Sequence, residues 1–116
     1  PLDVTDGAGI DRLGAAIAER WGRLDVLVGN AAMLGTLSPV GHIDPTEWTQ
    51  VMRVNVTANW WLLRSLDSLL RASPSGRAIF VTSGVTQAAF AYYGPYAASK
   101  SALESLVRTY AAEITK

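Results

Sequence analysis

Hydrophobic residues recur along the chain in two patterns, one helical and one typical of buried strands. Three- and four-residue steps between apolar positions predict amphipathic helices over about residues 10–21 and 45–72. Two short and nearly continuous apolar runs, 24–29 and 77–83, are typical of strands that are covered on both faces. A last helix begins at Pro95 and reaches the chain end. The pattern therefore alternates helix, strand, helix, strand, helix.

Polar caps and helix-breaking residues mark the helix boundaries. Asp6 is a candidate N-cap for the first helix, and Gly22 is a candidate stop. Asp44 is followed by a proline at the first helical position and a glutamate at the third, which is a strong start for the second helix. A stretch rich in Gly, Ser and Pro predicts a loop at about 30–43. A second loop is expected at 84–94.

Alternation of helices and strands implies an α/β fold whose parallel strands are joined by helical crossovers. Two strands with flanking helices would form part of a doubly wound, Rossmann-like parallel sheet. Such sheets bind ligands beyond the carboxyl ends of their strands. Asn30 follows the first predicted strand and Ser83 closes the second. Ligand-binding residues are therefore expected at these two points.

The composition is that of one small globular domain, and it removes several classes of function. The chain has 116 residues, 49% of them hydrophobic, and no cysteine, which excludes a disulfide scaffold and every thiolate metal site. Its single histidine, His42, excludes a multi-histidine metal site and is expected on a solvent-facing loop. A formal net charge of zero gives no electrostatic case for nucleic acid. No apolar run approaches the ~20 residues of a membrane span, so we expect a cytoplasmic protein.

Tyr96 and Lys100 stand four residues apart near the start of the last helix, so their side chains share one face. A phenol ionises with a pKa of about 10, and a neighbouring ammonium group favours the phenolate. Lowering such a pKa to about 7 requires roughly 4 kcal/mol, so a second positive charge, such as an oxidised nicotinamide ring, would be needed. The pair could act in acid/base catalysis, although a helix can also contain this spacing without any function.

Two further polar residues stand where chemistry could use them. Ser83 could donate a hydrogen bond to a substrate carbonyl oxygen, although serine commonly ends strands. Asn55 lies between two valines inside the long helix, where its amide competes for backbone hydrogen bonds. It either faces solvent, as we expect of Asn59 one turn later, or marks a local break that frees a backbone carbonyl to hold a water.

Taken together, these residues resemble the short-chain dehydrogenase/reductase family over essentially the whole chain. Asn55, Ser83 and the Tyr-x-x-x-Lys pattern follow one another in the family's order and spacing. The resemblance implies that Tyr96 is the general acid/base and that Lys100 holds the nicotinamide ribose and favours the phenolate. It also implies that Ser83 positions the substrate oxygen, and that Asn55 holds a water in the proton relay to the lysine.

The cofactor site is implied by two other stretches. Residues 27–32, Leu-Val-Gly-Asn-Ala-Ala, are similar to the family's strand-4 motif, and Asp3-Val4 resembles the pair that contacts adenine. Gly29 and Ala32 stand where the family usually has an asparagine that braces the sheet and a glycine. The residues that the resemblance implies in cofactor binding are Asp3, Val4, Asn30, Ala31, Ala32, Tyr96 and Lys100.

The resemblance implies an oxidoreductase that interconverts an alcohol and a ketone or aldehyde with NAD or NADP, and without a metal. It also implies that residues 1–116 are the central part of one domain, because the family's N-terminal glycine-rich segment and C-terminal substrate segment have no counterpart in the sequence. The alternative is a catalytically incompetent fragment or pseudo-enzyme that retains only packing or self-association. By the same resemblance, we expect a homodimer or homotetramer that forms through the helices at about 45–72 and 95–115.

Overall fold

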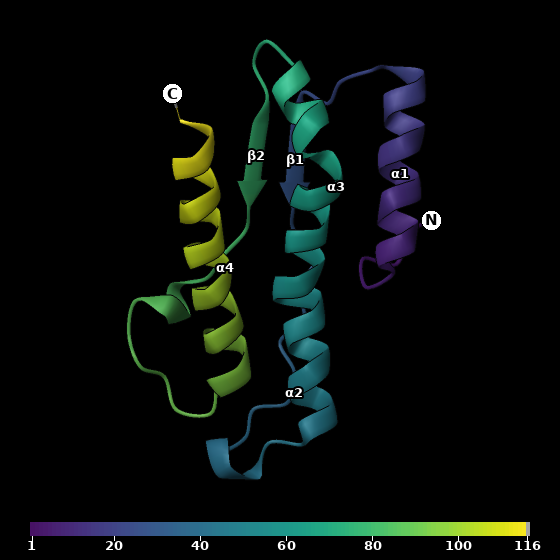
Figure 1. Cartoon of the computed structure of the whole chain (residues 1–116). Coiled ribbons are helices and arrows are strands. Elements are labelled where there is room, and N and C mark those ends of the chain that lie inside the picture. The colour runs from purple at the N-terminus through teal and green to yellow at the C-terminus, as the bar shows by residue number, and fades with distance from the viewer. Residues whose placement is uncertain (116) are drawn as a thin grey trace. The chain divides into compact units, whose positions relative to one another are not determined.

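The computed structural model describes residues 1–115 and confirms the predicted alternation of helices and strands (Figure 1). The elements are α1 (Gly7–Arg20), β1 (Val26–Gly29), η1 (Val40–His42), α2 (Pro45–Met52), η2 (Arg53–Thr57), α3 (Ala58–Ala72), β2 (Arg77–Phe80), η3 (Gly84–Thr86) and α4 (Gly94–Ile114). Within residues 1–115, no helix is long and apolar enough to cross a membrane.

The chain forms two compact units. The first unit comprises Pro1–Ala31 and Ala58–Val81, and the second comprises Ala32–Thr57 and the residues from Thr82 onward. The first contains α1, α3 and both strands, whereas the second contains α2, η2, η3 and α4.

In the first unit, β1 and β2 pair in parallel, as expected of an α/β fold. The register runs from Val26 opposite Arg77 to Gly29 opposite Phe80. Both strands are shorter than the predicted ranges 24–29 and 77–83. The predicted start of the first strand is wrong because the Leu24 N–H bonds to the Leu69 carbonyl of α3, at 3.0 Å, rather than to a strand.

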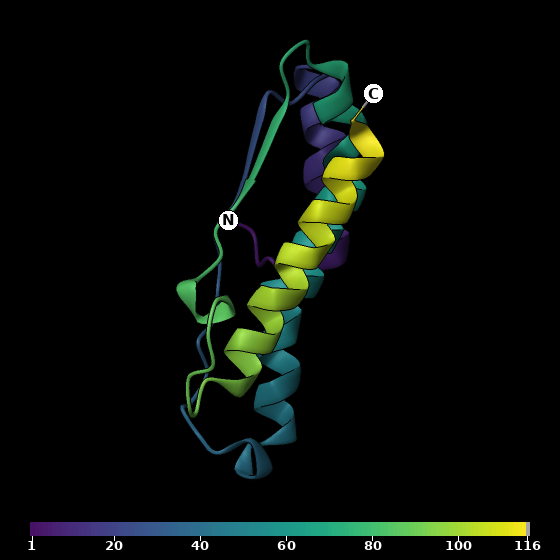
Figure 2. The same ribbon diagram turned by 90° about the vertical axis from the view of Figure 1, so that its left-hand side faces the viewer.

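Helix α3 packs on one face of this two-stranded sheet and α1 packs against α3; Figure 2 shows both helices on the same side of the strands. Leu27 and Gly29 point to that face and are buried, whereas Val26 and Val28 are exposed. The alternation follows from the two-residue period of a strand. Besides Arg77, the other face carries four apolar side chains that are more than two-fifths exposed: Val26, Val28, Ile79 and Val81. The two apolar runs were predicted to be covered on both faces. In the part of the chain that the structure describes, the first unit covers only one face of the strands.

The two helices of the first unit are joined by apolar packing and by hydrogen bonds to Asp11. Ile10 of α1 and Leu66 of α3 are almost fully buried. The Asp11 carboxylate accepts hydrogen bonds from the Ser65 hydroxyl, at 2.5 Å, and from the Trp61 indole N–H, at 2.9 Å. These two donors hold the pKa of Asp11 below its usual value. The N-cap predicted at Asp6 is confirmed, since its side chain accepts from the Gly9 N–H.

Asn59 is buried, although it was expected to face solvent, and its position explains why residue 29 is a glycine. It is 3% exposed, although its place on the helix predicted a solvent-facing side chain. A Cβ atom added to Gly29 would lie 2.6 Å from Asn59 Oδ1 and 2.4 Å from the Phe80 ring. The glycine at this strand position is therefore required by the side chains of α3 and β2 that fill the space.

We expect Gly29→Ala to lower the free energy of unfolding by about 1–3 kcal/mol, because overpacking a buried position forces its neighbours to move. The control is Gly41→Ala, since nothing lies within 4 Å of a Cβ at that position. Its effect should stay within about 0.5 kcal/mol. Denaturant unfolding of both variants measures the difference. Equal stability of the two variants would show that Phe80 and Asn59 do not constrain this position.

In the second unit, α4 packs against α2, η2 and η3. Asp44 caps α2 by accepting a hydrogen bond from the Thr46 N–H at 2.8 Å, as the sequence predicted. The glutamate expected in this cap, Glu47, accepts instead from the Thr36 N–H and so holds the preceding loop. Helix α4 begins at Gly94, one residue before the predicted Pro95.

Candidate active site

The four candidate catalytic residues all belong to the second unit. Asn55 lies in η2, Ser83 directly precedes η3, and Tyr96 and Lys100 lie in the first two turns of α4. The candidate cofactor-binding residues are divided between the units. Asp3, Val4, Asn30 and Ala31 belong to the first unit, and Ala32 belongs to the second.

Asn55 is fully buried and sits in a π-helical segment of five residues between α2 and α3. The sequence left open a solvent-facing residue or a local break, and the structure has the break. The Asn55 side chain donates to the Met33 carbonyl at 2.8 Å and accepts from the Met33 N–H at 2.8 Å. The two ends of the amide therefore hold the backbone N–H and C=O of one residue in the loop that precedes α2. Single π-helical turns are frequent at functional sites.

Ser99 is a member of the site that sequence reasoning missed. It is fully buried, and its hydroxyl donates to the Tyr96 carbonyl at 2.7 Å. The same hydroxyl accepts from Asn55 Nδ2 at 2.9 Å. Ser99 thus links η2 to the turn of α4 that carries Tyr96. A serine that bonds back to a carbonyl three residues earlier in its own helix is a known local pattern, but the bond to Asn55 gives no local signal.

Tyr96 and Lys100 share one face of α4, as their spacing predicted. The Lys100 ammonium lies 5.8 Å from the centre of the Tyr96 ring. Lys100 is 2% exposed and Tyr96 is half-buried. Burial lowers the pKa of the Lys100 ammonium from the ordinary value of a lysine, because desolvation penalises the charged form. A long polar side chain is kept in a costly position beside a phenol, which is typical of functional sites.

Ser83 lies three residues beyond the end of β2, so the prediction that it closes the strand is wrong. The strand ends earlier because Ser83 instead caps η3, and its hydroxyl accepts from the Val85 N–H at 3.4 Å. Its carbonyl oxygen lies 3.0 Å from the Thr86 hydroxyl oxygen. The Ser83 side chain is half-buried at the start of a short turn.

The candidate cofactor residues outside α4 lie in loops, and all of them except Val4 are exposed. The Asp3 carboxylate accepts from the Thr5 N–H at 2.9 Å and from the Thr5 hydroxyl at 2.8 Å. Asn30 and Ala31 directly follow β1 and are exposed, as the position of a ligand site at the carboxyl ends of strands requires. Ala32 has no positive φ, so its methyl group fits the backbone at the position where the family usually has glycine.

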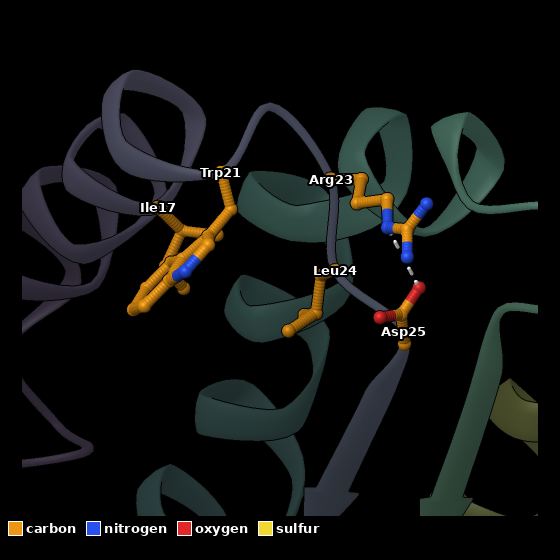
Figure 3. Close-up of a pocket in the computed structure, with 5 residues that line it drawn as sticks. All are labelled: Ile17, Trp21, Arg23, Leu24 and Asp25. Atoms are coloured by element: carbon orange, nitrogen blue, oxygen red, sulfur yellow. Dashed lines mark ion pairs between the residues drawn. The ribbon is translucent and has the colours of Figure 1, made fainter.

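A surface hollow of about 480 Å³ lies elsewhere in the first unit (Figure 3). Five residues from the end of α1 and the loop after it line the hollow: Ile17, Trp21, Arg23, Leu24 and Asp25. Arg23 and Asp25 form an ion pair at 3.2 Å across one side, and Trp21 is 63% exposed. This hollow contains none of the candidate catalytic or cofactor-binding residues. His42 is exposed in η1, as expected.

Comparison with known proteins gives consistent matches over almost the whole chain. A family model described as "short chain dehydrogenase" matches residues 1–116. The uncharacterized oxidoreductase YciK of Escherichia coli is 38% identical over 102 residues, which cover 88% of this chain and 40% of the relative. An uncharacterized oxidoreductase of Mycobacterium tuberculosis that is named NAD-dependent is 36% identical over 114 residues, which cover 97% of this chain and 41% of the relative.

Solved structures give the same result for the fold. A short chain dehydrogenase of Escherichia coli, solved in complex with NADPH, matches with a TM-score of 0.90 and 37% sequence identity. The match covers 97% of this chain and 48% of that structure. The chain thus spans about two fifths of the length of the curated relatives and about half of the solved one.

Proposed function

The chain belongs to the short-chain dehydrogenase/reductase family, and from that premise we propose that it is the central, catalytic part of an NAD(P)-dependent oxidoreductase. The reaction is the interconversion of an alcohol and a ketone or aldehyde. One observation carries the proposal: a nearly fully buried lysine, Lys100, lies one helical turn from Tyr96. The alternative, a pseudo-enzyme that retains only packing, gives no reason to keep an ammonium group desolvated beside a phenol.

The residues present suit a dinucleotide. Lys100 offers an ammonium with three donors, which suits the hydroxyl groups of the nicotinamide ribose. Asn30 and Ala31 would pass the adenosine part where they leave β1, and the Asp3 carboxylate would accept from the adenine amine. When bound, the nicotinamide supplies or accepts the hydride. One relative is named NAD-dependent and another was solved with NADPH, so both cofactors belong to the proposal.

The proton chemistry falls to the side chains of the second unit. In reduction, the Tyr96 hydroxyl gives its proton to the substrate oxygen, and in oxidation the phenolate takes that proton back. The Lys100 ammonium stabilises the phenolate by its charge. The Ser83 hydroxyl donates a second hydrogen bond to the same substrate oxygen and stabilises the charge that develops there.

Asn55 acts at the other end of this proton path. Its amide is fixed by Met33 and Ser99, so the π-helical backbone around it has a defined shape. A π-helical turn replaces i→i−4 hydrogen bonds by longer ones and leaves backbone carbonyls that are open to other donors. Such a carbonyl would hold the water that returns a proton to Lys100.

Isothermal titration of NADH and NADPH tests the proposal. Two proteins are compared: the 116-residue chain and a longer protein that adds the family's glycine-rich strand-turn-helix, whose helix N-terminus binds the pyrophosphate. We expect the longer protein to bind at least one reduced cofactor and the 116-residue chain to bind it much more weakly. Lack of binding of either cofactor to the longer protein would contradict the enzyme and favour the pseudo-enzyme.

A further inference from the structure

Glu104 joins the segment that carries Ser83 to the helix that carries Tyr96. Its Oε1 atom accepts a hydrogen bond from the Thr82 hydroxyl at 2.9 Å and another from the Thr86 hydroxyl at 3.0 Å. Glu104 lies in α4 one turn after Lys100. Residues four apart share a helix face, so Glu104 continues the face that presents the phenol and the ammonium.

Ser83 stands between the two threonines that Glu104 holds. The Thr86 hydroxyl is also 3.0 Å from the Ser83 carbonyl, and the Gln87 side-chain amide donates to that hydroxyl at 3.2 Å. The carboxylate therefore holds the chain on both sides of the serine. Hydrogen bonds to an ionised carboxylate are stronger than neutral ones. The bonds from Thr82 and Thr86 both end on a single oxygen atom of a residue in a helix.

The Ser83 segment needs such an anchor because the sheet does not reach it. The last ladder bond of β2 is the one from the Val81 N–H to the Gly29 carbonyl, at 3.0 Å. Beyond it, η3 is only three residues long, and its cap from Ser83 to Val85 is stretched to 3.4 Å. A single short 3₁₀ turn has poor hydrogen-bond geometry, so by itself it would define the position of the Ser83 hydroxyl loosely.

We propose that Glu104 is a positioning residue of the active site, which fixes the Ser83 hydroxyl relative to the Tyr96 hydroxyl through Thr82 and Thr86. This inference rests on the function proposed above for the serine and the tyrosine. Both hydroxyls must reach one substrate oxygen, and catalytic groups must be held closely to their productive geometry. Glu104 itself touches neither substrate nor cofactor in this role.

Steady-state kinetics of the whole enzyme test the proposal with three variants. Glu104→Ala removes both acceptor bonds and should lower kcat about 10- to 100-fold, with the cofactor KM unchanged. The primary isotope effect with 4-deuterated cofactor should rise, because chemistry becomes rate-limiting. Glu104→Gln keeps an oxygen acceptor for both threonines and should restore most of the rate. Glu113→Ala, an exposed carboxylate near the end of the same helix, should behave as wild type.

A role in stability alone would change the amount of folded enzyme and leave the kcat and the isotope effect of the folded fraction as they are. That result in Glu104→Ala would overturn the proposal. An equal loss in Glu104→Gln and Glu104→Ala would also overturn it, since the hydrogen bonds would then not be what matters. A different result would contradict the function proposed above: turnover retained in Tyr96→Phe.

Hydrogen exchange gives a second readout that needs no turnover. The backbone amides of Val85, Thr86 and Gln87 should exchange faster in Glu104→Ala than in Glu104→Gln, because η3 loses its anchor on α4. Amides in the middle of α4 should exchange at the same rate in both variants. Unchanged exchange at these three amides would contradict the anchoring role, whatever the kinetics show.

Discussion

Replacing Tyr96 by phenylalanine is expected to lower the turnover of the whole enzyme by at least about 10²-fold, as for the loss of a general acid. The change removes one hydroxyl group and keeps the half-buried ring beside Lys100. Cofactor affinity should therefore change little. Measuring kcat together with the cofactor dissociation constant separates the two effects.

Tyr93→Phe is the matched control for this experiment. Tyr93 lies just before α4, is half-buried, and packs edge-to-face on Phe90, with ring centres 6.3 Å apart. Removing its hydroxyl should leave kcat near the wild-type value. If Tyr96→Phe and Tyr93→Phe turn over equally well, the proton donor is another group, and the role assigned to Tyr96 is wrong.

Replacing Lys100 by methionine should impair both binding and chemistry, unlike the tyrosine change. Methionine keeps most of the length and apolar contact of this buried side chain and removes its charge. Without the ammonium, the phenolate form is less favoured, so the limb of the oxidation pH profile that reports its formation should move to higher pH. The KM for the cofactor should rise because three donors are lost.

Lys100→Arg provides the control, because arginine keeps the positive charge but not the compact ammonium geometry. Its KM should rise while the pH profile stays close to that of the wild type. Burial lowers the pKa of the Lys100 ammonium, so in the wild type the charge is lost at a lower pH than for an ordinary lysine. The favourable effect on the phenolate should decline above that point. A profile that is unchanged in Lys100→Met would restrict the lysine to ribose binding.

The order of the elements was predictable because hydrophobic periodicity is a local property. The caps at Asp6 and Asp44 were predictable for the same reason, since each bonds to its own first turn. The strand ends were not predictable, because Leu24 bonds to α3 and Ser83 caps η3. The burial of Asn59 depends on a strand that lies far from it in the sequence, and no local pattern reports that contact.

Within the candidate site, spacing on one helix placed Tyr96 and Lys100 on a common face. The break at Asn55 was one of two alternatives, and only its burial against Met33 decides between them. Ser99 and Glu104 were not found because their partners come from other elements. A serine or glutamate in an amphipathic helix is ordinary until the tertiary structure shows which donor or acceptor it meets.

Transfer of deuterium tests the central proposal most directly. The whole enzyme, in wild-type and Tyr96→Phe forms, would be supplied with 4-deuterated NADH or NADPH and a panel of ketones and aldehydes, and the products analysed by mass spectrometry. We expect the wild type to place deuterium on the carbinol carbon of at least one product alcohol, and Tyr96→Phe to do so at least about 10²-fold more slowly. Labelled alcohol formed at the same rate by both forms, or no labelled alcohol from an enzyme that binds the cofactor, would contradict it.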